Sequence, residues 1–419
     1  MLGLAYGSPI PIKAVKHMKI VDVRIRELTG TAQYTDDLWQ GRQRSPMDIY
    51  PEAKARTGRE LYKAWKFIGD GDSHEVKGVF VEIDTDEGIT GIAGPINWTI
   101  PCVYIEAQLK PLLLGKDPFA TELIWDQMYR SSPHGRKGYH MHAISYVDIA
   151  LWDIKGKALG LPVCRLLGGP VQQKIPAYAS TVGFSLELEK VYEKVKQFRA
   201  DGYTATKWFV SEGPTDGPEG ERKNVELIKT IREAGGPDMK IMLDSWSGWD
   251  VPYTLKMARL MEEYEPHWFE EPVLTDLPKS YARLRRECPV KISGGEHEFT
   301  RWGAKAMMDN DCCDIYQMDT VWAGGISELM KIYTLASTYD VPVIPHGCSS
   351  HINAHVSFAH NATLAPMMED LIAFRQMTQH FLAHPLIPVD GYFTPPEVPG
   401  MGIDLDESKI ESERTLSWE

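Results

Sequence analysis

Five short apolar runs between residues 241 and 346 each end in a residue that can bind a metal ion or move a proton. The five end residues are Asp244, Glu270, Glu296, Asp319 and His346. Asp244, Glu270 and Glu296 follow one another at intervals of 26 residues, and His346 comes 27 residues after Asp319. Such an interval fits one strand, one helix and two loops, which predicts parallel βα units. Because a closed (β/α)8 barrel carries its active site at the carboxyl ends of its strands, the pattern predicts one pocket built from five distant residues.

The length of 419 residues exceeds what one hydrophobic core usually serves, so more than one domain is expected. Strand-like alternation near residues 19–26 and 78–84 predicts a small antiparallel sheet, and helical periodicity follows it. We predict an α/β protein with an N-terminal α+β capping domain and a modified (β/α)7β or (β/α)8 barrel. The predicted parts are a flexible leader at 1–17, the capping domain at 18–168, the barrel at 169–385, and a C-terminal segment at 386–419 that packs on the capping domain.

Composition narrows the choice of partners and compartment. The net charge of −13 argues against general binding to nucleic acid or to an anionic membrane. No stretch is long and apolar enough to span a bilayer, the first 19 residues lack the regions of a signal peptide, and the six cysteines form no C-x-x-C pair. We therefore expect a cytoplasmic protein with reduced thiols.

The polar and aromatic segment from Thr29 to Gly71 is longer than a loop that only connects two elements of a compact domain. Long loops of this kind often close over a binding site. Tyr34, Arg42 and Arg44 are its candidates for contacts to substrate hydroxyl and carboxylate groups, with solvated side chains as the alternative.

Several motifs carry a resemblance to a known family. They are Ala150-Leu-Trp-Asp-Ile-Lys-Gly-Lys157, Trp268-Phe-Glu-Glu-Pro272, Ser293-Gly-Gly-Glu-His297, Asp319 with Gly324-Gly325, and Pro345-His-Gly347. In this order and spacing the chain resembles the mandelate racemase branch of the enolase superfamily, and most closely its acid-sugar dehydratases, including those that act on L-rhamnonate. The resemblance implies a Mg²⁺ cofactor, a small-molecule acid sugar as substrate, and a homo-oligomer.

The chemistry of that family needs positive charge, because removing a proton next to a carboxylate creates a second negative charge. The carboxylates of Asp244, Glu270 and Glu296 are hard oxygen ligands that suit Mg²⁺, which would act as a Lewis acid. The alternative is three solvated or salt-bridged acids. The family pattern makes Glu270 the ligand, and strand alternation would turn Glu271 away from the site.

His346 is the predicted base, because an imidazole with a pKa near 6.5 can take up a proton at neutral pH and return it. Asp319 would hold the other ring nitrogen and fix the tautomer, an arrangement that resembles the family's His-Asp dyad. His351 is a rival base, since it lies five residues further along the chain.

Three further residues are assigned through the resemblance. Lys207 takes the place of the first lysine of the family's Lys-x-Lys pair, where it would stay a cation near the substrate carboxylate. Phe209 stands at the second place and cannot exchange a proton, so one base acting on one face, as in dehydration, is expected. His297 would contact a sugar hydroxyl or assist the leaving group, with a structural role as the alternative. Glu369 corresponds to the glutamate that donates to the developing ene-diolate.

We therefore predict a hydro-lyase that removes the α proton of an acid sugar and eliminates the β hydroxyl to give a 2-keto-3-deoxy acid. The alternatives are an epimerase or cycloisomerase of the same superfamily, and a member without catalytic activity. The retained acid-base pair argues against the last of these.

Overall fold

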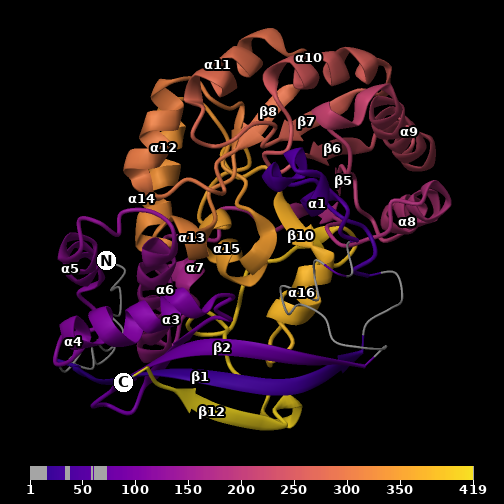
Figure 1. The fold of residues 1–419 in the computed structure, drawn as a ribbon. Coiled ribbons are helices and arrows are strands. Elements are labelled where there is room, and N and C mark those ends of the chain that lie inside the picture. Colours follow the sequence, from indigo (N-terminus) through magenta and orange to yellow (C-terminus); the bar gives the residue numbers. More distant parts are fainter. Residues whose placement is uncertain (1–16, 34–37, 58–59, 61–72, 419) are drawn as a thin grey trace, which may run out of the picture.

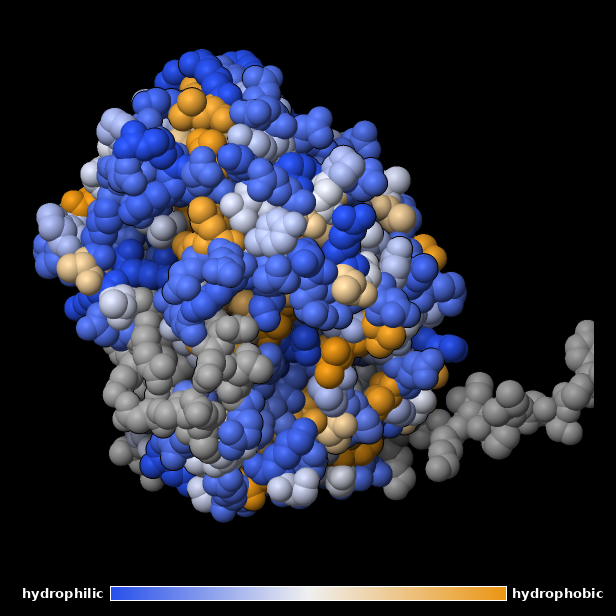
Figure 2. Space-filling model, turned by 90° about the vertical axis from the view of Figure 1, so that its right-hand side faces the viewer, coloured by the Kyte–Doolittle hydropathy of each residue, from blue (hydrophilic) through white to orange (hydrophobic). Residues whose placement is uncertain are grey.

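The structure is a computed structural model that describes residues 17–33, 38–57, 60 and 73–418. It consists of an antiparallel sheet with neighbouring helices and a curled parallel sheet surrounded by further helices (Figure 1). None of the helices in this described part of the chain combines the length and hydrophobicity needed to cross a bilayer. The face seen in Figure 2 is mostly hydrophilic, with hydrophobic residues in small separate clusters, as is ordinary for a protein surface.

The antiparallel sheet is formed by the two ends of the chain. Its strand order is β12-β1-β2-β3, with bounds β1 (Ile20–Gln33), β2 (Ser73–Thr85), β3 (Thr90–Ala93) and β12 (Ser412–Leu416). Strand β1 continues to Gln33, so the start of the segment predicted as a loop from Thr29 is extended strand instead. β12 pairs with β1 through Ile25 and Leu416, which ties the C-terminal segment to this sheet. The exact domain limits stay a prediction.

Helices from two stretches of the chain, one between β1 and β2 and one between β3 and β4, complete the cap. Their bounds are η1 (Pro46–Ile49), α1 (Pro51–Lys54), α3 (Thr99–Tyr104), η2 (Ile105–Leu109), α4 (Lys110–Leu113), α5 (Thr121–Ser131), α6 (Tyr139–Leu159) and α7 (Val163–Leu166). Helix α6 is buried along most of its length because its apolar residues are not confined to one face. It ends at Gly160, whose φ of 66° suits a residue without a side chain.

The parallel sheet runs in the order β10-β4-β5-β6-β7-β8-β9. Its strands are β4 (Ile175–Ser180), β5 (Ala205–Phe209), β6 (Lys240–Asp244), β7 (Pro266–Glu270), β8 (Lys291–Gly294), β9 (Ile315–Tyr316) and β10 (Met368–Leu371). Because the last of these strands pairs with the first, the sheet curls back on itself. A short strand β11 (Tyr392–Phe393) adds to β4 in the antiparallel sense.

Helices follow the strands in alternation. They are α8 (Leu188–Ala200), η3 (Pro214–Asp216), α9 (Gly217–Gly235), α10 (Val251–Leu260), η4 (Glu262–Tyr264), α11 (Pro278–Glu287), α12 (Thr300–Asp309), α13 (Thr320–Ala323), α14 (Gly325–Thr338), η5 (Gly347–Ser349), α15 (Ser350–Ser357), α16 (Ile372–Thr378) and η6 (Glu407–Lys409). This alternation around a curled parallel sheet, together with the antiparallel cap, confirms the predicted fold class.

One predicted strand is reduced to a single bridge. The run from Val341 to His346 contributes only a parallel bridge between Val343 and Tyr316. Pro342 and Pro345 lack the N–H groups that a ladder needs, which explains why the run forms no regular strand. The run still lies beside β9, so the place of a seventh strand is filled and the side chain of His346 reaches the carboxyl end of the barrel.

Candidate active site

A cavity of about 570 Å³ lies at the carboxyl ends of the parallel strands, between the barrel and the cap. Six of the eight predicted site residues line it: Lys207, Asp244, Glu296, His297, His346 and Glu369. The other two, Glu270 and Asp319, are buried directly behind the wall and contact Lys207 and His346. The structure therefore brings together all the predicted residues, although their roles stay predictions.

Lys207 is the centre of the charged part of the site. Its ammonium group contacts Glu270, lies 2.9 Å from Oε1 of Glu369 and lies 3.6 Å from Oδ2 of Asp244. The side chain is only 2% exposed, so Lys207 is not a solvated surface lysine. Burial alone would lower the pKa of Lys207, but the carboxylates of Glu270 and Glu369 outweigh it and raise the pKa well above its ordinary value.

The three predicted metal ligands lie at the carboxyl ends of adjacent strands β6, β7 and β8. Burial raises the pKa of Asp244 to about 6 and the pKa values of Glu270 and Glu296 to about 7, and other carboxylates nearby add to each rise. Lys207 opposes the rise at Asp244 and Glu270. The second oxygen of Glu270 accepts hydrogen bonds from Nε1 of Trp268 at 3.1 Å and Nε2 of Gln317 at 2.7 Å. Several buried carboxylates that disfavour one another's charge form a set that a divalent cation would stabilise.

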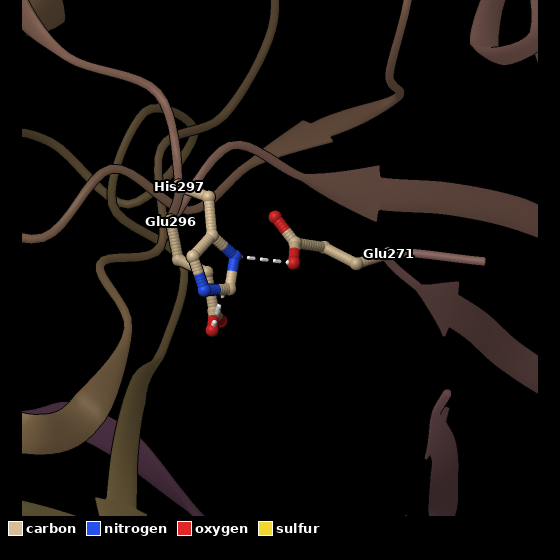
Figure 3. A group of neighbouring side chains, drawn as sticks. All are labelled: Glu271, Glu296 and His297. Atoms are coloured by element: carbon tan, nitrogen blue, oxygen red, sulfur yellow. Dashed lines mark hydrogen bonds and ion pairs between the residues drawn. The ribbon is translucent and has the colours of Figure 1, made fainter. Parts of the chain in front are cut away.

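The prediction that Glu271 turns away from the site is wrong. Its carboxylate lies 2.6 Å from Nδ1 of His297 and accepts a bond from the backbone N–H of Gly295, as Figure 3 shows for the histidine contact. The alternation argument fails because the chain leaves the extended conformation at this residue, where φ is 38°. The only indication of its role in the sequence was that a second acid, Glu271, directly follows Glu270 at the end of β7.

Glu271, Glu296 and His297 form a group of possible metal donors whose ligand atoms lie within 4.8 Å of one another (Figure 3). Burial lowers the pKa of His297, but Glu271 more than compensates and raises it to about 9. A protonated imidazole has no lone pair for a metal ion. We therefore interpret His297 and Glu271 as an ion pair beside Glu296.

His346 and Asp319 form a hydrogen-bonded pair. Nδ1 of His346 lies 3.0 Å from Oδ2 of Asp319, whose other oxygen accepts the backbone N–H of Val321 at 2.8 Å. Burial opposes protonation of His346, but Glu296 and Asp319 outweigh it and raise the pKa to about 10. The rival His351 lies in α15, does not line the cavity, and has its pKa lowered to about 4 by burial. The geometry thus favours His346 over His351.

Glu369 lies in β10 with both oxygens engaged. Oε2 accepts the backbone N–H of Gly347 at 2.6 Å, and Oε1 faces Lys207. The neighbouring Asp370 faces the other way, because it accepts from the hydroxyl of Tyr203 at 2.7 Å. Burial would raise the pKa of Glu369, but Lys207 and His346 outweigh it and lower the pKa, so this carboxyl group is set up to accept hydrogen bonds.

The loop arginines are engaged in pairs within the protein. Arg42 contacts Asp48, and Arg44 lies 2.6 Å from Asp216, so neither is free to bind a substrate carboxylate in this structure. Tyr34 lies outside the described residues. From the same segment Gln43 lines the cavity, and no pattern in the sequence singled it out.

Phe209 is buried at the end of β5 and does not line the cavity. Its ring lies under Gly41, where an added Cβ would come within 2.5 Å of Cζ of Phe209. The position that the resemblance gives to a second lysine is thus filled by a ring that packs against the cap.

Comparisons with known proteins agree with this architecture. Residues 190–409 match the family "enolase C-terminal domain-like", and residues 66–168 match the N-terminal domain of the mandelate racemase / muconate lactonizing enzyme family. An L-rhamnonate dehydratase from Saccharopolyspora erythraea is 34% identical over 404 residues, which cover 93% of this chain and 97% of that protein.

Solved structures extend the comparison to three dimensions. Rhamnonate dehydratase from Gibberella zeae complexed with Mg has a TM-score of 0.81 at 29% identity, over 94% of this chain and 96% of that one. The 3,6-anhydro-D-galactonate cycloisomerase from Zobellia galactanivorans has a TM-score of 0.73 at 29% identity, over 94% of this chain and 100% of that one. By its two domain matches and its relative of 34% identity, the chain belongs to the enolase superfamily, in the mandelate racemase / muconate lactonizing enzyme family.

Proposed function

We propose that this protein is a Mg²⁺-dependent dehydratase of an acid sugar, with L-rhamnonate as the first substrate to test. The enzyme would remove the proton on carbon 2 and expel the hydroxyl group on carbon 3, which yields a 2-keto-3-deoxy acid. The support from relatives is the L-rhamnonate dehydratase of 34% identity and the Mg complex of the similar Gibberella zeae enzyme.

Asp244, Glu270 and Glu296 would hold the metal ion. They fit it because they offer hard oxygen ligands at three adjacent strand ends, and because burial and mutual repulsion raise their pKa values, an effect that a divalent cation would offset. When bound, Mg²⁺ supplies Lewis-acid stabilisation of the extra negative charge on the substrate carboxylate. Enolase-superfamily enzymes as a class combine such a metal with a Lys or His base, so this division of roles is a general property of the superfamily.

The observation that carries the proposal is the pair of His346, on the cavity wall, and Asp319, buried behind it. Asp319 would accept a hydrogen bond from Nδ1–H, which leaves the lone pair of Nε2 to take the proton from carbon 2. Because Glu296 is the main charge that raises the pKa of His346, its use as a metal ligand would favour the neutral imidazole. The imidazolium formed by proton removal would then return a proton to the departing hydroxyl group. Because Phe209 is buried outside the cavity, no second lysine is available at that place to approach the opposite face.

Lys207 would contribute its positive charge beside the substrate carboxylate. The resemblance implies that Glu369 donates a hydrogen bond to the ene-diolate, yet here Oε2 accepts the N–H of Gly347 and Oε1 is ion-paired with Lys207. Fixing the position of Lys207 is therefore the role that we propose for Glu369. His297, held by Glu271, would contact a substrate hydroxyl group.

The test is an assay of aldonic and aldaric acids with Mg²⁺, in which 2-keto-3-deoxy products are detected with semicarbazide. We expect a product that needs Mg²⁺ and a fall in kcat of about 10²- to 10⁴-fold in His346→Asn. His384→Asn is the matched control, because His384 is 52% exposed and lies outside the cavity.

Undiminished turnover in His346→Asn would refute the assignment of the base. An epimer at carbon 2 without a keto product would replace dehydration by epimerisation. No product and no solvent exchange with any acid would refute the dehydratase proposal.

A further inference from the structure

One side of the cavity, where the cap meets the barrel, is walled by aromatic rings that the proposed mechanism does not use. Trp98, Tyr139, Phe299 and Trp322 all line the cavity, and the imidazole of His142 lies among them. Ring centroids of His142 are 5.1 Å from Trp98, 5.6 Å from Tyr139 and 5.9 Å from Phe299. An aromatic wall of this kind can pack against the C–H faces of a sugar chain.

His142 is close to the reacting end of the site through one shared neighbour. Its ring is nearly parallel to that of Trp322, with 5.6 Å between the centroids and 4° between the planes, and the Trp322 ring is 4.7 Å from that of His346. Helix α6 of the cap supplies His142, whereas Trp322 and His346 follow barrel strands. A ligand that extends from His346 along Trp322 would therefore meet His142 next.

The imidazole of His142 lacks the partners that a buried polar ring normally has. The residue is 5% exposed, and its Nδ1 is buried without a hydrogen-bond partner. Among the described residues, no neighbouring side chain satisfies this nitrogen. A phenyl ring would fill this aromatic pocket without leaving a buried polar atom unpaired, so the nitrogen atoms need another explanation.

The protonation state of His142 suits a neutral hydroxyl group. Burial, assisted by the charge of His297, lowers its pKa to about 3. A neutral imidazole carries one donor and one acceptor nitrogen. Because Nδ1 is buried, a hydroxyl group in the cavity would pair with Nε2, as donor or as acceptor. A charged ligand group would find no opposite charge on this ring at neutral pH.

We propose that His142 is a substrate-binding residue that hydrogen-bonds a hydroxyl group of the acid sugar beyond carbon 3, while the surrounding rings pack against the C–H groups of the chain. The inference rests on the proposed function. It gives the cap a direct part in choosing among acid sugars, since the partner hydroxyl group must be present and within reach.

The test measures binding without turnover. L-rhamnonate is titrated by calorimetry, with Mg²⁺ present, into His346→Asn and into the same protein with His142→Phe. We expect Kd to rise about 5- to 20-fold, because the ring stays and only the hydrogen bond is lost. His142→Gln, which restores a polar nitrogen, should recover part of the affinity, and it also serves if the phenylalanine variant does not fold.

His140→Phe is the matched control on the same helix, because His140 packs on Tyr104 at 4.3 Å and does not line the cavity. Analogues of L-rhamnonate that lack the hydroxyl group at carbon 4 or at carbon 5 locate the contact. For the analogue that lacks the hydroxyl group bound by His142, His142→Phe should no longer raise Kd.

If His142→Phe raises Kd equally for L-rhamnonate and for both analogues, the role of His142 is structural and the inference is overturned. Unchanged affinity in His142→Phe would overturn it as well, and would leave the proposed dehydration intact. If L-rhamnonate neither binds to His346→Asn nor reacts with the wild-type protein, the proposal of this substrate fails, and the inference fails with it.

Discussion

Asp319→Asn tests whether the carboxylate behind His346 sets the tautomer of the base. Asparagine has the same shape, and its oxygen can still accept the backbone N–H of Val321 that Oδ1 accepts at 2.8 Å. Its amide group would then face Nδ1 of His346, where Oδ2 now lies at 3.0 Å. Because an amide N–H donates, Nδ1 would become the acceptor and Nε2 would carry the proton. The nitrogen proposed to act as base would have no free lone pair.

Two contributions set the expected size of the effect. Loss of a buried charge-assisted hydrogen bond destabilises the imidazolium by about 1.5–3 kcal/mol, which corresponds to a decrease in rate of roughly 10- to 150-fold. Reversal of the tautomer adds to this loss, so the total should lie within the range of about 10²- to 10⁴-fold that general base catalysis contributes.

The assay is steady-state turnover of the acid sugar found in the substrate panel, with Mg²⁺ at saturation. We expect kcat to fall while KM changes less than about threefold, because Asp319 does not line the cavity. Asp319→Ala is the comparison variant, since it also leaves the N–H of Val321 unpaired and should lower the melting temperature. A fall in kcat of less than about 10-fold in folded Asp319→Asn would refute this account of the tautomer.

Two further variants test the electrostatics. In Lys207→Met we expect the free energy of unfolding, measured by urea titration in EDTA, to fall by about 3–5 kcal/mol, because Glu270 and Glu369 lose their buried partner. Mg²⁺ should reduce this loss of stability. An equal loss with and without Mg²⁺ would contradict the proposed cation site. Asp148, which accepts from Oγ of Ser327 at 2.6 Å, has its pKa raised to about 7 by burial, above the value of about 3.9 in the unfolded chain. Its contribution is fully present below about pH 4 and is lost as pH rises through 7, so the stability of the wild type relative to Asp148→Asn should fall by up to about 4 kcal/mol between pH 4 and 8. A difference in melting temperature that does not change with pH would contradict this expectation.

The barrel and most of the site could be predicted from the sequence because both depend on local patterns. Parallel strands leave apolar runs, and a functional side chain just after each run must lie at the carboxyl edge of the sheet. The run ending at His346 shows the limit of this reasoning, since Pro342 and Pro345 reduce the expected strand to one bridge although the side chain still reaches the cavity.

Residues placed by the local backbone or by contacts between distant segments could not be predicted in the same way. Glu271 joins the site because φ at this residue is positive, which strand alternation does not anticipate. His142 comes from a cap helix that is buried on most sides, and no motif in the sequence singled it out. Arg44 was a candidate for substrate contact, and only the structure reveals its pairing with Asp216.

The most direct test of the account is proton exchange at carbon 2 of a 3-deoxy acid sugar, which has no hydroxyl group to eliminate. In heavy water with Mg²⁺, NMR should show that the wild-type protein replaces the carbon 2 proton by deuterium, that His346→Asn does not, and that no carbon 2 epimer accumulates. Exchange that persists in His346→Asn, or an epimer formed by the wild type, would contradict removal of the proton by His346 from one face.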